Sequence, residues 1–227
     1  MYKKLASGLI VSCQAAEGEV FHGLGLMRYM AKAAKAGGAA GIRALADEIP
    51  SIREETDLPV IGLVKKKYEG SEVYITPTRR EADVLLETGC DVIAIDATAR
   101  PRPQGETAES LFSYIKKAAP GIAVMADCDT LESALAADKI GFDYAGTTMR
   151  GYTRETAGIG IPDYAFLKEF CGALRHAKPI AEGGIWETGQ LKKVLECKPY
   201  AVVIGTAITR PADITARFTK IMAEVRG

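Results

Sequence analysis

The chain alternates short apolar runs rich in Val, Ile and Ala with longer segments of helical period, and it does so eight times. Continuous apolar runs are typical of parallel strands buried on both faces. Strict alternation of strand and helix builds either an open doubly wound sheet or a closed (β/α)8 barrel. The runs that we expect to be strands are 9–13, 41–43, 60–64, 92–95, 122–126, 144–145, 179–181 and 201–204.

Segments between these runs have the apolar spacing of helices, and glycine follows several of them, as Gly89 and Gly141 do. Glycine is common just past a helix C-terminus. A length of 227 residues suits one barrel with a single large core. We therefore predict one α/β domain over residues 1–227, a (β/α)8 TIM barrel, with a doubly wound sheet as the alternative. The expected helices are 26–36, 79–88, 108–118, 131–139, 164–174 and 212–225.

Charge, cysteine and histidine content narrow the class of protein. With 29 basic and 29 acidic residues the chain has no net charge, so we expect neither nucleic acid nor a membrane surface as partner. No apolar stretch approaches the roughly 18 residues of a membrane span, and no leader pattern opens the chain. Five scattered cysteines without a C-x-x-C pair favour reduced thiols in the cytoplasm. The two histidines, His22 and His176, lie far apart, so we expect no metal site.

Two of the apolar runs, 179–181 and 201–204, lead into glycine almost directly. Glycine after a buried strand lets backbone N–H groups approach an anion, because no Cβ stands in the way. As the seventh and eighth strands of a barrel, these runs lie where that fold most often binds phosphate. The residues predicted to bind phosphate are Gly183, Gly184, Gly205, Thr206 and the guanidinium of Arg210.

Polar residues lie at or just after the end of nearly every expected strand. In a (β/α)8 barrel the active site is built at the carboxyl ends of the strands. One polar residue there means little, since loops are polar by default, but the recurrence at successive strands indicates a site. The residues in these positions are Gln14, Arg43, Lys65, Asp96, Asp127, Thr147, Thr148 and Glu182.

Along nearly its whole length the sequence resembles N-acetylmannosamine-6-phosphate 2-epimerases. The matching segments are LIVSCQA at 9–15, AAKAGGAAGIRA at 33–44, PVIGLVK at 59–65, YITPT at 74–78, DVIAIDATARPRP at 91–103, ADCDT at 126–130, GTTMRGYT at 146–153, IAEGGI at 180–185 and VVIGTAITRP at 202–211. The resemblance implies a (β/α)8 barrel that interconverts N-acetylmannosamine 6-phosphate and N-acetylglucosamine 6-phosphate in sialic acid catabolism. It also implies that no redox cofactor takes part, so we expect no cofactor.

Epimerisation beside a latent aldehyde requires ring opening, removal of the α-proton and return of a proton to the opposite face. We expect Lys65 to be the base, because burial and nearby cations lower the pKa of an ammonium group, and the resemblance implies the same role. Glu182 is expected to move a proton at the ring oxygen or the anomeric hydroxyl. Without a catalytic role, Lys65 would be a solvated lysine and Glu182 a carboxylate in a structural ion pair.

Four further residues are predicted to bind the sugar. Arg43 is expected over the sugar or beside Lys65 and Glu182, with a structural ion pair as the alternative. Gln14 is expected to bind the acetamido group or a hydroxyl, and Asp127 to bind a hydroxyl or to orient Lys65. Tyr152 completes the predicted substrate-binding set.

At the position of Gly184 the family often carries a polar or basic residue, so a side-chain contact with phosphate is missing there. Three other functions stay open: a Schiff-base lysine aldolase on the same barrel, another sugar-phosphate epimerase such as one acting on pentulose phosphates, and a sugar-phosphate sensor without turnover. The resemblance also implies a homodimer in which the last helix takes part. An apolar stripe from Ile214 through Phe218 to Val225 is compatible with that role.

Overall fold

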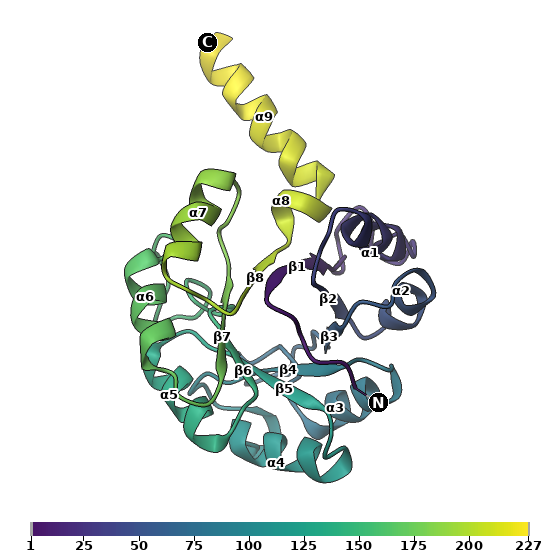
Figure 1. Ribbon diagram of the computed structural model, residues 1–227, viewed down its shortest axis with the longest axis vertical. Coiled ribbons are helices and arrows are strands. Elements are labelled where there is room, and N and C mark those ends of the chain that lie inside the picture. The colour runs from purple at the N-terminus through teal and green to yellow at the C-terminus, as the bar shows by residue number, and fades with distance from the viewer. Residues whose placement is uncertain (1, 227) are drawn as a thin grey trace.

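Eight parallel strands close into a barrel in which each strand pairs with the next and β8 pairs back with β1. The computed structural model describes residues 2–226. Figure 1 shows the strands at the centre with helices around them. The closed barrel confirms the predicted fold class and excludes the open doubly wound sheet. The strands are β1 (Gly8–Cys13), β2 (Gly41–Leu45), β3 (Val60–Leu63), β4 (Val92–Asp96), β5 (Ala123–Asp127), β6 (Tyr144–Gly146), β7 (Lys178–Glu182) and β8 (Ala201–Ile204).

The strands are apolar throughout because both of their faces are buried. In β3, Ile61 and Leu63 pack in one cluster with Met125 of β5 and Ile180 of β7. Since these strands are not neighbours, that cluster fills the inside of the barrel. Val60 packs instead in a second cluster, which lies between the strands and the helices. Each Leu or Ile buried in this way stabilises the fold by about 1.5–3 kcal/mol.

Helices alternate with the strands and cover the outside of the barrel (Figure 1). Two of them begin at threonine caps, where the Oγ1 of Thr107 accepts from the N–H of Ser110 at 3.0 Å and that of Thr130 from the N–H of Ser133 at 3.1 Å. Each cap stabilises its helix by about 1 kcal/mol. The helices are α1 (Met27–Ala36), α2 (Ile49–Glu55), α3 (Arg79–Glu87), α4 (Ala108–Ala118), α5 (Leu131–Ile140), α6 (Tyr164–Ala173), α7 (Thr188–Glu196), α8 (Thr206–Thr209) and α9 (Pro211–Arg226), with a 3-10 turn at Pro103–Gly105.

The sequence-based bounds differ from the structure in two ways. Helices α2, α7 and α8 were not among the expected helices; α2 and α8 are too short to show a clear 3.6-residue period. Strand β3 ends one residue early, at Leu63, whereas five strands run one or two residues past their expected ends, to Leu45, Asp96, Asp127, Gly146 and Glu182. The longer strands arise because strand pairing is made by backbone groups, so a residue of any type, including a polar one such as Asp96, can continue the ladder.

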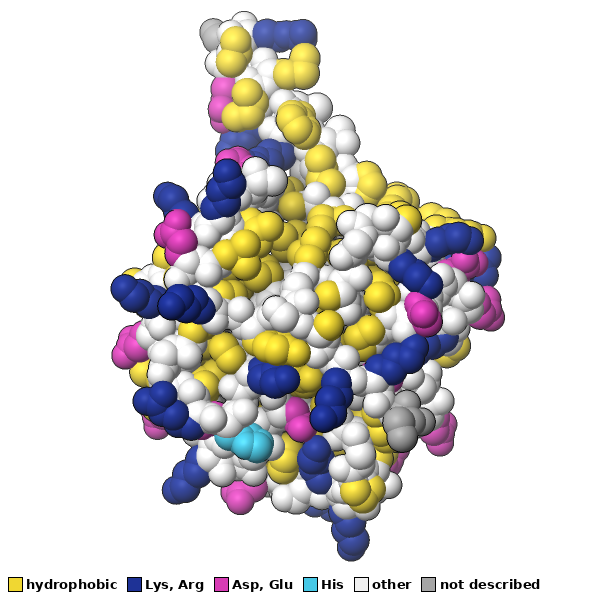
Figure 2. Space-filling view, in the orientation of Figure 1, with side chains coloured by type: hydrophobic (Ala, Val, Ile, Leu, Met, Phe, Trp, Pro, Cys, Tyr) yellow, Lys and Arg dark blue, Asp and Glu magenta, His cyan; other side chains and the backbone are white. Residues whose placement is uncertain are grey.

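Helix α9 projects away from the barrel (Figure 1). None of its residues is buried, and Phe218 and Val225 are 69% and 81% exposed. Figure 2 shows apolar side chains along this projecting helix. Neither α9 nor any other helix within residues 2–226 has the length and apolar content needed to cross a membrane.

Candidate active site

A cavity of about 480 Å³ opens at the end of the barrel where the strands have their carboxyl ends. Its volume lies in the usual range for small-molecule sites. Every predicted site residue except Asp127 lies in its wall. Those lining residues are Gln14, Arg43, Lys65, Tyr152, Glu182, Gly183, Gly184, Gly205, Thr206 and Arg210.

Arg43, from β2, lies at the floor of the cavity and is only 1% exposed. Its Nη1 donates to Oδ1 of Asp127 at 3.0 Å, and its Nη2 donates to Oδ2 at 2.6 Å. Burial alone would lower the pKa of Arg43, but the carboxylates of Asp127 and Glu182 outweigh it and raise that pKa. Arg43 is therefore a fixed positive charge, and Asp127 lies beneath it rather than in the cavity wall.

Glu182 ends β7 and points into the cavity beside Arg43, with its Oε2 at 3.4 Å from Nη1 of the arginine. Thr147 holds the backbone of Glu182, since its Oγ1 accepts from the N–H at 2.9 Å and donates to the carbonyl at 2.8 Å. Burial raises the pKa of the Glu182 carboxyl, Arg43 opposes that shift, and Asp127 adds to it. A carboxyl that keeps its proton more readily than usual is suited to donate it to a substrate oxygen.

Lys65 follows β3 on the opposite side of the cavity floor. The segment around Ile75 braces it, because Lys65 and Ile75 form an antiparallel bridge and the N–H of Lys66 donates to the carbonyl of Tyr74 at 2.9 Å. The side chain is exposed to the cavity, yet the barrel mouth surrounds it. Partial burial lowers the pKa of Lys65, and Arg43 and Arg210 lower it further, whereas Glu19 and Glu182 oppose the shift. The amine is therefore easier to deprotonate than an ordinary lysine.

The predicted phosphate-binding segments lie side by side, since β7 and β8 are paired neighbours. Gly183 and Gly184 have φ values of +113° and +72°, which side-chain-bearing residues rarely adopt. A Cβ on Gly184 would come within 2.5 Å of the backbone of Ile161. The loop after β6 thus leaves no room for a side chain at position 184. Gly205 precedes α8 and faces Ser12 of β1.

Arg210, at the entry of α9, lines the same cavity and pairs with Glu19 of the loop after β1 at 2.5 Å. Both side chains are about 30% exposed, so the pair is accessible to solvent. A phosphate in the cavity would therefore compete with Glu19 for the guanidinium.

The two remaining predicted residues lie at different depths. Gln14 is buried, and its Nε2 donates to Oγ of Ser12 at 2.9 Å, whereas Tyr152 is 60% exposed at the rim. Sequence reasoning assigned no role to several other lining residues. Two of them could have been found from the sequence, because Thr148 follows the end of β6 and Tyr74 belongs to the YITPT motif. The cavity-lining side chains without an assigned role include Ser12, Tyr74, Thr148, Trp186, Gln190 and Thr209.

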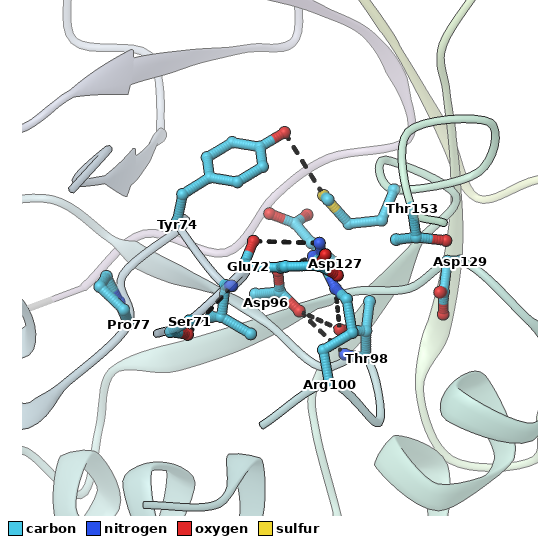
Figure 3. A network of polar contacts seen from close by, with 12 residues as sticks. Ser71, Glu72, Tyr74, Pro77, Asp96, Thr98, Arg100, Asp127, Asp129 and Thr153 are labelled. Atoms are coloured by element: carbon cyan, nitrogen blue, oxygen red, sulfur yellow. Dashed lines mark hydrogen bonds and ion pairs between the residues drawn. The ribbon is translucent and has the colours of Figure 1, made fainter. Parts of the chain in front are cut away.

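A second polar network lies beside the cavity (Figure 3). Asp96, at the end of β4, accepts from Nη2 of Arg100 at 2.6 Å and from the N–H of Thr98 at 3.0 Å. Arg100 also donates to the carbonyl of Glu72 at 3.0 Å. Burial raises the pKa of Asp96, and Arg100 opposes this shift. Asp96 therefore ties the loop after β4 to the loop after β3 and does not line the cavity.

Within residues 2–226 no group of three or more His, Cys, Asp or Glu side chains is arranged to hold a metal ion. His22 Nδ1 lies 3.0 Å from the carbonyl of Ala15, so this histidine is part of the loop after β1. The charged groups that face the cavity are instead one carboxyl, one lysine and two arginines, namely Glu182, Lys65, Arg43 and Arg210.

A family model described as "Putative N-acetylmannosamine-6-phosphate epimerase" matches residues 27–224. A protein of Staphylococcus carnosus named "Putative N-acetylmannosamine-6-phosphate 2-epimerase" is 50% identical over 219 residues, which is 95% of this chain and 97% of the relative. A protein of the same name from Caldanaerobacter subterraneus subsp. tengcongensis is 47% identical over 225 residues, covering 99% and 94% of the two chains.

The fold has a close counterpart among solved structures. The structure of the N-acetylmannosamine-6-phosphate 2-epimerase from Clostridium perfringens superposes with a TM-score of 0.91 at 45% sequence identity. The match covers 96% of this chain and 94% of that one. The likeness therefore extends over nearly the whole of both chains.

Proposed function

The chain belongs to the N-acetylmannosamine-6-phosphate epimerase family, and from that premise we propose that it interconverts N-acetylmannosamine 6-phosphate and N-acetylglucosamine 6-phosphate in amino sugar catabolism. The reaction inverts C2, the carbon that bears the acetamido group. Once the ring is open, this carbon lies next to the aldehyde, so its proton is acidic enough for a protein base to remove.

Lys65 is the base in this proposal. Support comes from its place in the cavity wall and from the direction of its pKa, which partial burial, Arg43 and Arg210 all lower. A lower pKa leaves a larger share of the amine neutral near neutral pH, and only the neutral amine can accept the C2 proton. The lysine then carries the proton as an ammonium group, and inversion is complete when this ammonium group or a water molecule returns a proton to the opposite face of C2.

Glu182 is the acid. It gives a proton to the sugar oxygen at C1 or in the ring and takes it back when the ring closes. Its raised pKa supports this role, because a protonated carboxyl is needed at the start. Arg43 holds positive charge beside the oxygen that becomes negative, while Asp127 fixes Arg43 from below through two hydrogen bonds.

The rest of the cavity binds the substrate. We assign the 6-phosphate to the backbone of Gly183, Gly184, Gly205 and Thr206, with Arg210 as its counter-charge. The acetamido group or a hydroxyl is assigned to Gln14, and a contact at the rim to Tyr152. Asp127 does not contact the substrate in this proposal, because it lies outside the cavity wall.

The observation that carries the proposal is that a lysine with a lowered pKa and a carboxyl with a raised pKa line one cavity beside two glycine-rich segments. The direct test is to incubate the protein with N-acetylmannosamine 6-phosphate and to follow N-acetylglucosamine 6-phosphate by chromatography. We expect conversion toward an equilibrium mixture that is the same from either side. A protein that binds the sugar phosphate without converting it would be a sensor, and the proposal would be wrong.

A Schiff-base aldolase would use the same lowered pKa of Lys65, since the neutral amine also attacks a carbonyl. Borohydride separates the two functions. An aldolase would be trapped covalently at Lys65 when the reductant is added with a sugar phosphate, whereas the epimerase is expected to keep an unmodified lysine by mass spectrometry.

We further propose that the protein works in the cytoplasm as a homodimer. Five unpaired cysteines support a reducing compartment. The exposed apolar residues of α9, including Phe218, Ile221 and Val225, support a second copy as the partner that covers this helix.

A further inference from the structure

Thr148 lies in the loop after β6, between two acidic side chains. Its Oγ1 is 2.7 Å from Oδ1 of Asp127 and 3.0 Å from Oε2 of Glu182. The hydroxyl thus bridges a carboxylate below the cavity floor and the carboxyl that faces the cavity. Sequence position alone indicated only that a polar residue follows the strand.

A threonine hydroxyl has one proton, and an ionised carboxylate has none. If Asp127 and Glu182 were both ionised, Thr148 could donate to only one of them. The other contact would then bring two oxygen atoms together at hydrogen-bond distance with no proton between them. Thr148 can make two separate hydrogen bonds here, rather than share its one proton between two acceptors, only when one of the two carboxyls carries a proton and donates it to Thr148.

Asp127 is the closer partner of Arg43. Its two oxygens accept from Nη1 and Nη2 of Arg43 at 3.0 and 2.6 Å, which is the bidentate geometry of a charged pair. Glu182 lies farther from Arg43, at 3.4 Å, and is about 15% exposed to the cavity. The shorter Thr148 contact is also the one to Asp127.

We propose that Thr148 is a positioning residue that keeps the proton on Glu182, because its hydroxyl donates to Asp127 and accepts from the Glu182 carboxyl. The resulting chain of hydrogen bonds runs in one direction, from Glu182 through Thr148 to Asp127. Before substrate binds, it holds the acid in its protonated form with the proton on Oε2, and that proton passes to the sugar oxygen when this oxygen takes the place of Thr148 as acceptor.

This arrangement also bears on the base. One proton can be held either by Glu182 or by Lys65, and the total charge of the site is the same in both cases. By favouring the proton on Glu182, Thr148 leaves Lys65 as the neutral amine. The charged groups that face Glu182 are Arg43 from β2, Asp127 from β5 and Lys65 after β3. Burial raises the pKa of Glu182, in the direction that the chain requires, and the shift stays upward although a hydrogen bond donated by Thr148 to Glu182 acts to lower it.

Infrared difference spectroscopy tests this inference without substrate, because the C=O stretch of a protonated carboxyl is separate from carboxylate bands. The samples are wild type, Thr148→Val, which removes the hydroxyl at nearly constant shape, and Thr148→Ser, which keeps it. Glu182→Gln assigns the band. Circular dichroism verifies that each variant is folded.

We expect a carboxylic acid band at neutral pH in wild type and Thr148→Ser, absent in Glu182→Gln and lost or shifted to lower pH in Thr148→Val. The inference is overturned if wild type lacks the Glu182 band, or if Thr148→Val keeps it at the same pH as wild type. A Thr148→Val band that persists to higher pH would mean that Thr148 donates to Glu182, which is the opposite direction.

Turnover gives a second readout, and this part rests on the proposed function. We expect kcat of Thr148→Val to fall about tenfold with KM little changed, and Thr148→Ser to recover most of it, since one hydrogen bond to a charged group is at stake. If wild type shows the Glu182 band but no epimerisation, the proposed function fails while the inference on Thr148 stands. If turnover is present and the band absent, the inference fails alone.

Discussion

At the scale of single residues, the proposed acid of the cavity is Glu182, a carboxyl group that the fold largely shields from bulk water. Glu182 is largely buried at the end of β7 near Asp127, and this burial is the main reason why its pKa is raised. A group whose pKa is higher in the folded than in the unfolded state favours folding only while it is protonated. The property that suits Glu182 to donate a proton is therefore unfavourable for stability near neutral pH.

Glu182→Gln is expected to abolish epimerisation and to stabilise the fold in a pH-dependent manner. In the unfolded chain Glu182 ionises near pH 4.3, whereas in the folded protein it keeps its proton to higher pH. The wild-type free energy of unfolding should therefore decrease, relative to that of the variant, as pH rises from about 4.3 to the raised pKa. Urea denaturation of both proteins from pH 3.5 to 8 measures the difference. A difference that stays constant over this range would contradict the raised pKa.

Gly184→Ala should destabilise the protein by about 1–3 kcal/mol, because the position has a φ of +72° and a Cβ would meet the Ile161 backbone at 2.5 Å. Gly189→Ala is the matched control. Gly189 lies in α7 with no neighbour within 4 Å of a Cβ, so alanine should be neutral or stabilise the helix by up to about 1 kcal/mol. Thermal unfolding of both variants provides the comparison. Equal effects of the two substitutions would contradict the close approach of Ile161.

Sequence reasoning was most informative for residues whose position at a strand end decides whether they line the cavity. Lys65 and Glu182 follow from their place at strand ends, because the barrel brings all such ends to one face. Asp127 met the same criterion but lies under Arg43, since its two hydrogen bonds to that side chain depend on a residue 84 positions away. Nothing local in the sequence reveals such a pairing, nor the approach of Ile161 to Gly184.

At the scale of elements, α9 differs from the other helices because it has no buried residue. Its stripe of Phe218, Ile221, Met222 and Val225 is at least half exposed. At its base, the guanidinium of Arg217 lies 5.2 Å from the ring of Trp186, which lines the cavity. The helix is thus fixed at one end beside the site and projects into solvent at the other.

Phe218→Glu combined with Val225→Glu is expected to convert the proposed dimer into a monomer, because it places charges within the apolar stripe. Lys220→Glu is the control, since Lys220 lies on the opposite face of the helix and is well exposed. Sedimentation equilibrium over a range of protein concentrations gives the masses. A wild-type protein that is monomeric at every concentration, or a double variant that remains dimeric, would contradict the proposal.

The strands were predictable from sequence because they are continuous apolar runs, and most helices because they are long enough to show a 3.6-residue period. α2 and α8, with seven and four residues, were not, and α8 positions Gly205 in the cavity wall. The direction in which α9 projects depends on tertiary packing, so it could not be predicted from the apolar stripe of the helix.

At the scale of the whole molecule, barrel closure assembles the site. Residues as far apart as Gln14 and Arg210 line one cavity because β8 pairs with β1. Each of the eight strands contributes to the rigid frame, while the loops at their carboxyl ends carry the chemistry. The predicted organisation of residues 1–227 as one domain stays a prediction.

The central claim is that Lys65 removes the C2 proton. Proton NMR of N-acetylmannosamine 6-phosphate in deuterium oxide tests it with wild type and Lys65→Ala, and circular dichroism confirms that the variant is folded. We predict that wild type forms the gluco epimer with deuterium at C2, and that Lys65→Ala forms no epimer and exchanges no C2 proton. Epimer that retains protium at C2, or a Lys65→Ala variant that exchanges as fast as wild type, would contradict the account.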